Sequence, residues 1–247
     1  IIIPEEFGGL GLGFAETAVV AEELARTLSP EPLVASSVLS ASLLIAGENE
    51  ALKKKLLSKL ATGETIIGAG LAGRVPGLST GGSTLEVKAA GADSVLNGTM
   101  RHVYPAFSAT DFIVAAKGAD GIALYHIAAN AAGLSIADEL RADGTMAGTL
   151  TFKDVKVGAA ALVAKGAKAE AAIRRATDAA NIISCAELFA CMNQALDITL
   201  EYMRTRVQFG KPIGSFQALQ HRTVDLWIQK ELSIGALADA IRTLNDP

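Results

Sequence analysis

The sequence predicts an α+β fold with an N-terminal helical domain, a middle antiparallel β domain that is barrel-like, and a C-terminal helical bundle. Three observations support this order. Amphipathic helical patterns fill the chain up to Gly63. Short β-branched segments broken by glycine continue to about Val157. From Ala167 to about Thr205 no proline or glycine occurs, which is typical of one long helix.

We therefore expect three regions, at residues 1–63, 64–164 and 165–247 of the 247-residue chain. Hydrophobic residues make up 50% of the sequence and charged residues 19%, so the chain can bury a core and is not of the disordered class. The net charge is −4, with acids and bases interspersed. This balance excludes an extended nucleic-acid-binding surface.

The first region is predicted to contain three helices. The first covers Ala15–Leu28 and is stopped by the prolines that follow it. The second covers Val34–Ala46 and ends at Gly47. The third is expected to begin at Asn49 as N-cap and to end at Gly63 as the left-handed stop.

The middle region is predicted to be a sheet without crossover helices. No helix-length pattern separates its strands, which favours antiparallel pairing or a barrel over βαβ units. Asn97-Gly98 is interpreted as a hairpin turn, because both residues tolerate positive φ. The expected strands are Thr65–Leu71, Thr84–Ala89, Ser94–Leu96, Asp111–Ala116, Gly121–Ile127 and Gly148–Phe152.

The last region reads as a helical hairpin. The long helix is broken at residues 209–214, and Ser215 is expected to N-cap a second helix from Phe216 to about Leu244. Two antiparallel helices are half of a four-helix bundle. Their uncovered apolar face predicts a homo- or hetero-oligomer, either a dimer or a tetramer.

Cysteine content and hydropathy bear on the location of the protein. Cys185 and Cys191 lie six positions apart on one helix, so they face different directions and do not pair. We interpret them as small buried residues, and no metal-ligand spacing is present. Reduced thiols fit a cytoplasmic protein. No stretch reaches the roughly 18 apolar residues of a membrane span.

One glycine motif is treated as a chance match. Gly68, Gly70 and Gly73 spell G-x-G-x-x-G, which in dinucleotide-binding folds opens a helix that holds the pyrophosphate. Here the residues Arg74–Gly77 follow and do not start a helix. We interpret the motif as a glycine-rich strand end.

The segment between the two long helices is the most informative. Arg204 and Arg206 end the first helix, where cations suit the negative end of the helix dipole. The same segment also offers Gln208 and Phe209, and Gln217 in the first turn of the next helix. A guanidinium fork beside free helix N–H groups can hold a pyrophosphate. Chemistry alone leaves capping and cofactor binding both open.

The same residues carry a resemblance to a known family. Arg206 to Gln217 resembles the acyl-CoA dehydrogenase signature R-x-x-F-G-x-x-(I/L)-x-x-x-Q. Pro4 to Gly13 is similar to that family's P-E-(E/Y)-x-G-G-x-G loop. The order of helical, β and helical regions also resembles the family, so the resemblance covers the whole chain, which looks like a piece with both ends missing.

The resemblance implies an FAD enzyme that oxidises the Cα–Cβ bond of an acyl-CoA thioester. A carboxylate removes the α-proton while a hydride leaves Cβ for the flavin, and an electron-transfer flavoprotein or similar acceptor takes the electrons. By this resemblance Arg206, Gln208, Phe209 and Gln217 contact the FAD diphosphate and adenosine from a neighbouring protomer.

Three departures from the family pattern leave an alternative open. Leu71–Gly77 lacks the acid and the serine of the family's T-E-P-x-(A/G)-G-S flavin loop. Tyr104 lies where the family has its W-x-T/S strand, but the tryptophan is replaced. A flavin contact is assigned to Tyr104 only because of this position. The catalytic carboxylate lies either past the last residue or near Ala180, where Asp178 is two positions off, so no base is named. The alternative is a flavin-poor, non-catalytic partner subunit, and a third reading is a helical scaffold without a ligand.

Three further titratable residues carry less weight. His126 is read as a packed or edge histidine, and His221 as a packing or capping residue. Glu187 lies on the apolar side of the long helix without an identified partner and is left unassigned.

Overall fold

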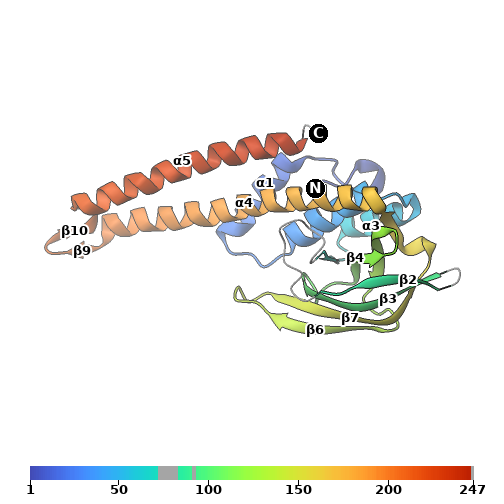
Figure 1. Cartoon of the computed structure of the whole chain (residues 1–247). Helices are drawn as coiled ribbons and strands as arrows, with labels where there is room; N and C mark the ends of the chain where they lie inside the picture. The colour runs from blue at the N-terminus through green and yellow to red at the C-terminus, as the bar shows by residue number, and fades with distance from the viewer. Residues whose placement is uncertain (72–82, 91–92, 246–247) are drawn as a thin grey trace. The chain divides into compact units, whose positions relative to one another are not determined.

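The computed structural model describes residues 1–71, 83–90 and 93–245. They form two compact units: the first consists of Ile1–Leu12 and Pro30–Ala180, the second of Gly13–Ser29 and Asn181–Pro247. Figure 1 shows the elements of both units, and each unit is described by itself. The three regions predicted from the sequence, with boundaries at residues 63 and 164, are consecutive segments of the chain and stay a prediction.

The helices of the first unit begin and end where the sequence predicts. Asn49 N-caps the third helix, since its Oδ1 accepts a hydrogen bond from the Leu52 N–H at 3.1 Å. Gly63 ends that helix with a φ of 75°. The predicted second helix is divided into a π-helical and an α-helical part. The elements are η1 (Glu5–Phe7), η2 (Leu33–Ser40), α2 (Ala41–Ala46) and α3 (Glu50–Thr62).

Eight strands of the first unit form one sheet in the described part of the chain, in the order β6-β7-β3-β2-β4-β5-β8, with β1 beside β4. Two of them, β6 and β8, are not predicted from the sequence. The strands are β1 (Ile67–Gly70), β2 (Glu86–Ala90), β3 (Asp93–Val103), β4 (Asp111–Gly118), β5 (Gly121–Ala128), β6 (Leu134–Leu140), β7 (Met146–Val157) and β8 (Leu162–Lys165); the short η3 (Ala159–Ala161) precedes β8.

Strand β4 lies at the centre of this unit and is buried on both faces. Ile113 and Ala115 face a cluster formed with α2, α3 and the first part of α4 (Gly166–Thr205). Phe112 and Val114 face a second cluster formed with β3, β5 and β7. The alternation follows from the two-residue period of a strand. In Figure 1, α3 and β7 accordingly lie on opposite sides of β4.

The α+β class is confirmed, but the antiparallel, barrel-like description of the sheet needs two corrections. β1 and β2 each pair with β4 in parallel, so the sheet is mixed. No pairing between the end strands β6 and β8 closes a barrel in the described residues. The cause is that β1 and β2 are joined by a long connection rather than a tight turn, which allows both to run alongside β4 in the same direction.

The hairpin turn predicted at Asn97-Gly98 is wrong. Both residues lie inside β3, where the pairing with β7 shifts register between Leu96 and Gly98. Gly98 has a φ of 125°, and a Cβ there would lie 2.5 Å from the Thr84 carbonyl oxygen. Glycine is therefore required here by a β-bulge and by the close approach of another backbone segment. A tight turn requires glycine for the same reason, which is why the sequence signal is misleading here.

The second unit is helical. α1 (Phe14–Arg26) packs near the end of α5 (Gln217–Asn245), and the Phe14 N–H donates to Asn245 Oδ1 at 3.2 Å. α4 runs as one helix to Thr205 and connects to α5 through β9 (Val207–Gln208), β10 (Lys211–Pro212) and η4 (Ile213–Ser215). The predicted antiparallel helical hairpin is confirmed (Figure 1).

Two expectations about this unit are wrong. Ser215 does not cap α5, because its hydroxyl donates to the Pro212 carbonyl oxygen at 2.7 Å and the helix begins only at Gln217. Cys185 is exposed rather than buried, whereas Cys191 is half-buried. Cys185 and Cys191 do face different directions, and burial of the helix on one side explains why only one of them is covered.

Candidate cofactor site

A tight β-hairpin presents the residues that the sequence assigns to the cofactor. Gln208 pairs with Lys211 across two turn residues, Phe209 and Gly210. Both turn residues have positive φ, at 54° and 79°, which is the pattern of a type I′ turn. Positive φ is uncommon for a phenylalanine, so the flanking pairing imposes this backbone. The Ile213 N–H closes the hairpin by donating to the Arg206 carbonyl at 2.8 Å.

Aromatic contacts brace the hairpin against the start of α5. The rings of Phe209 and Phe216 meet edge-on, with centroids 6.1 Å apart and planes at 85°. The Lys211 ammonium lies 4.5 Å from the centre of the Phe216 ring. The Phe209 side chain is nevertheless 90% exposed, so its ring is available to a ligand.

The two arginines at the end of α4 have different partners. Arg204 lies 3.6 Å from Glu201, one turn earlier on the helix. Arg206 forms no ion pair or side-chain hydrogen bond within the described residues, and it is exposed together with Gln208 and Gln217. A free guanidinium in the same short segment as two exposed amide side chains suits a diphosphate. The hairpin thus brings together four of the five predicted site residues.

The start of α5 adds backbone donors to this set. The N–H groups of Leu219 and Gln220 both donate to the Phe216 carbonyl. Those of Gln217 and Ala218 have no partner in the described part of the chain, as expected for the first turn of a helix. Beside the hairpin, a groove of about 630 Å³ is lined by residues such as Met203, Pro212 and Trp227.

Tyr104, the fifth predicted residue, belongs to the first unit, whereas the β-hairpin belongs to the second. Its hydroxyl donates to the Pro30 carbonyl at 3.3 Å, and the Arg141 guanidinium lies 4.9 Å from its ring centre. In the segment Leu71–Gly77, which differs from the family's flavin loop, only Leu71 is described, and residues 72–77 lie outside the described part. The contact of Tyr104 with the flavin therefore stays a prediction.

The G-x-G-x-x-G match is explained by packing at the positions that are described. A Cβ on Gly68 would lie 2.3 Å from the Pro105 carbonyl oxygen, and one on Gly70 would lie 2.7 Å from Met100 Cγ. Both glycines lie within strand β1, where close backbone approach requires them. Gly73 lies outside the described residues.

Among the described residues, the candidates on α4 and α5 show no arrangement that identifies a catalytic base. Asp178 is exposed on α4 and Ala180 is buried. Burial raises the pKa of the half-buried Glu187, and no partner for it is found among the described residues. His221 is exposed. No cluster of His, Cys, Asp or Glu that could bind a metal is found in the described part of the chain.

His126 belongs to a polar cluster that sequence reasoning missed. Its Nε2 lies 2.6 Å from Asp111 Oδ1, and Thr65 and Thr110 donate to Asp111 Oδ2 at 2.6 and 2.8 Å. Burial raises the pKa of Asp111, but these hydrogen bonds and the His126 charge outweigh burial and lower it to about 2. The cluster joins β1, β4 and β5, so its members could not be associated from sequence spacing.

Comparisons with known proteins agree with this fold. A model of the acyl-CoA dehydrogenase N-terminal domain matches residues 1–64, and a model of the C-terminal domain matches residues 173–246. Together they cover more than half of the chain. The fold is thus that of a flavoprotein dehydrogenase, with the Arg206–Gln217 hairpin inside the matched C-terminal domain.

The chain belongs to the acyl-CoA dehydrogenase family, a family of FAD-dependent oxidoreductases acting on CH–CH bonds. The acyl-CoA dehydrogenase IpdE2 of Mycolicibacterium smegmatis is 30% identical over 98% of this chain and 62% of the relative. The mitochondrial isovaleryl-CoA dehydrogenase of Arabidopsis thaliana is 29% identical over 92% of this chain and 58% of the relative.

A solved structure shows the same likeness. The ChsE4–ChsE5 complex from Mycobacterium tuberculosis contains a chain that is 28% identical, with a TM-score of 0.86 over 99% of this chain and 65% of that one. The chain spans about 60% of the length of the curated relatives it matches. No helix among the described residues has the length and apolar character needed to cross a bilayer.

Proposed function

We propose that the intact protein is an acyl-CoA dehydrogenase-type enzyme that uses FAD to oxidise the Cα–Cβ bond of an acyl-CoA thioester. The observation that carries this proposal is the Arg206–Gln217 hairpin. Its backbone is fixed by a type I′ turn, and its polar side chains are exposed. Family membership supplies the reaction class.

The hairpin residues have distinct roles in this proposal. Arg206 holds the FAD diphosphate with its planar fork of donors. Gln208 and Gln217 donate amide hydrogens to the same region, and the exposed ring of Phe209 packs against the adenosine. The bound FAD supplies the hydride acceptor. An electron-transfer flavoprotein or similar acceptor would then reoxidise it.

The exposed position of the hairpin supports binding across a subunit interface. Arg206, Gln208 and Phe209 point to solvent within their own unit rather than into a closed pocket. A neighbouring protomer can therefore supply the rest of the site. This arrangement requires an oligomer, and we propose a dimer or tetramer formed through the C-terminal helices.

A second candidate function is that of a flavin-poor partner subunit in a heteromeric complex. The position on α4 that is one family location of the catalytic carboxylate is occupied by the buried Ala180, and Asp178 is directed to solvent. One similar solved structure is a complex of two differently named subunits, ChsE4 and ChsE5. In this case the hairpin would complete a site on the other chain.

A cytoplasmic location completes the proposal. Cys185 and Cys191 are both free thiols, which fits a reducing compartment.

The test is FAD retention by the full-length protein and three variants, measured by flavin absorbance after gel filtration and by titration with FAD. Arg206→Ala should weaken FAD binding by about ten- to a hundredfold, because a charge-assisted hydrogen bond contributes about 1.5–3 kcal/mol. The FAD affinity of Arg206→Lys should lie between those of wild type and Arg206→Ala, since lysine keeps the positive charge but lacks the planar, bidentate donors of the guanidinium. Arg204→Ala is the matched control and should have little effect.

Two outcomes would contradict the proposal in different ways. Equal losses of thermal stability from Arg204→Ala and Arg206→Ala, with FAD affinity unchanged, would show that both arginines only stabilise the helix end. Absence of FAD from the wild-type protein, even with a partner subunit present, would favour the partner-subunit function.

A further inference from the structure

The sheet of the first unit contains a second cavity, of about 1040 Å³, that involves none of the predicted cofactor residues. It forms where β2 separates from β4. These two strands pair only at Glu86 and Lys117. After that pair, β2 stays beside β3, while β4 turns back into β5. The third wall consists of residues between β7 and β8, such as Gly158 and Ala159, together with Leu162 of β8.

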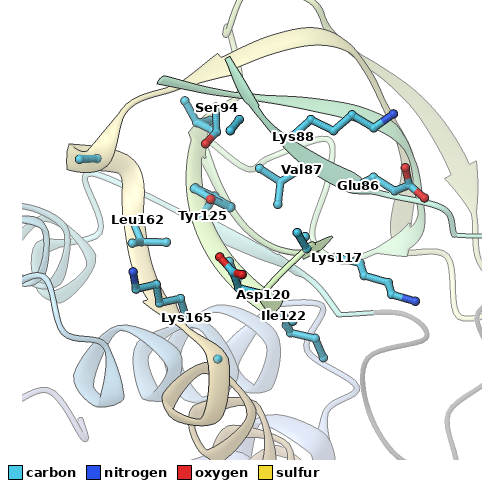
Figure 2. A pocket seen from close by; sticks show the side chains of 18 of the residues that line it. Glu86, Val87, Lys88, Ser94, Lys117, Asp120, Ile122, Tyr125, Leu162 and Lys165 are labelled. Carbon is cyan, nitrogen blue, oxygen red and sulfur yellow. The ribbon is translucent and has the colours of Figure 1, made fainter. Parts of the chain in front are cut away.

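Tyr125 on β5 lies at the centre of this cavity (Figure 2). Its side chain is buried, with 9% of the residue exposed. Within the described residues its hydroxyl has no hydrogen-bond partner. The hydroxyl oxygen is not itself among the buried side-chain atoms that lack a partner, so it is accessible from the cavity. The ring of Tyr125 is thus held by the sheet while its hydroxyl remains free to form a hydrogen bond with a molecule in the cavity.

Other polar oxygens border the same space. Figure 2 shows the hydroxyl of Ser94 and the carboxylate of Asp120 near Tyr125, whereas the side chains of Lys88 and Lys117 extend away from it. Ser94 is half-buried and also has no side-chain partner in the described part of the chain. The two hydroxyls can each donate or accept a hydrogen bond.

The remaining lining determines the charge that a ligand can carry. Apolar contact is offered by Val87, Ile122 and Leu162. The charged residues of the lining are Glu86, Lys88, Lys117, Asp120 and Lys165. They are two acids and three bases, so their charges nearly cancel. An ion of either sign would meet one opposite and one like charge, at Asp120 and Lys165, so neither sign gains a surplus of opposite charge, and desolvation opposes both.

We propose that this cavity binds an uncharged amphipathic molecule. Its hydrocarbon part lies against Val87, Ile122 and Leu162, and its hydroxyl or carbonyl group forms a hydrogen bond with the Tyr125 hydroxyl. The site is separate from the cofactor hairpin, so the proposal does not depend on the proposed FAD function. Mixed apolar walls with a few convergent polar groups are typical of small-molecule sites.

The test uses three probes of one size that differ in charge: benzyl alcohol, benzoate and benzylamine. Binding to the full-length protein is measured by isothermal titration calorimetry. Benzyl alcohol should bind at millimolar concentration, and at least about tenfold more tightly than either charged probe. Tyr125→Phe keeps the buried ring and removes only the hydroxyl, so it should weaken benzyl alcohol binding by about three- to tenfold.

Two further variants locate the binding. Tyr202→Phe makes the same chemical change on α4, at a residue that is 55% exposed and does not line the cavity, and it should leave the affinity unchanged. Ala89→Phe fills the mouth from an exposed position on β2, so it should abolish binding without unfolding the protein. The proposal is overturned if benzyl alcohol does not bind, if Tyr125→Phe or Ala89→Phe binds it as wild type does, or if a charged probe binds more tightly.

Discussion

The two units of this chain use their apolar residues in opposite ways. In the first unit, β4 has five consecutive side chains, from Phe112 to Ala116, that are 0% exposed. In the second unit, Leu237 is the only buried residue of α5 in its described part. Large apolar side chains such as Trp227 and Leu232 are 46% and 64% exposed there. The sheet therefore completes its own core, whereas the helical hairpin does not.

This difference shows what each unit requires. A strand buried on both faces is stabilised by residues of the same unit. A long helix with an exposed apolar stripe needs further structure to cover it. Val224, Ile228 and Leu232 recur at four-residue spacing and form such a stripe on α5.

The largest effect is expected on assembly. The double variant Ile228→Glu/Leu232→Glu places two charges on the stripe, and burying an unpaired charge costs several kcal/mol. The full-length wild type should be a dimer or tetramer in size-exclusion light scattering, and the variant should have the mass of one protomer. Gln229→Glu adds charge to the same helix at an exposed polar position and should leave the mass unchanged. A monodisperse wild-type monomer would show that the stripe needs no partner.

A smaller effect is expected in the core of the sheet. Phe112→Ala removes a fully buried ring and should lower the free energy of unfolding by about 3–5 kcal/mol, measured by urea denaturation. Leu140→Ala is the control on the same sheet, because this residue is 76% exposed and its loss should cost less than about 0.5 kcal/mol. Similar costs for the two variants would mean that β4 is not the central strand of the core.

The smallest effect concerns acid stability. The Asp111 pKa falls from 3.8 to about 2 on folding, so ionised Asp111 stabilises the folded state above pH 3.8. This contribution is lost as the pH falls from 3.8 to about 2. Allowing for partial solvent exposure, it is about 1 kcal/mol. Asp111→Asn should therefore reduce the acid dependence of stability in that range, measured by denaturation at several pH values. An unchanged acid dependence would show that Asp111 is not perturbed.

Local signals predicted the helices of this fold well. The Asn49 cap and the Gly63 stop depend on neighbouring backbone groups, so the sequence carries their full information. Gly98 shows the limit of such signals, because a turn and a bulge both require positive φ. Strands β6 and β8 depend on partners far along the chain, and their own residues give no decisive pattern.

The two candidate sites differ in the same way, because one is formed by residues close in sequence and the other by residues far apart in sequence. Arg206, Gln208 and Phe209 are close in sequence, so their common location could be predicted from a motif. The cavity around Tyr125 is formed by β2, β5 and the segment before β8, which only the tertiary fold brings together. A tyrosine in a strand gives no indication of whether its hydroxyl meets a partner or an empty space.

The turn at Phe209 and Gly210 has a consequence for protein engineering. Asparagine is preferred at the first position of a type I′ turn, and Phe209 adopts a φ of 54° that disfavours its side chain. Sequence optimisation for thermal stability would therefore select Asn-Gly here, as would a consensus built on turn statistics alone. Such a design would remove an aromatic ring that is 90% exposed. It would gain stability at the position that we propose for contact with the adenosine of FAD, so stability and the proposed cofactor binding favour different residues there.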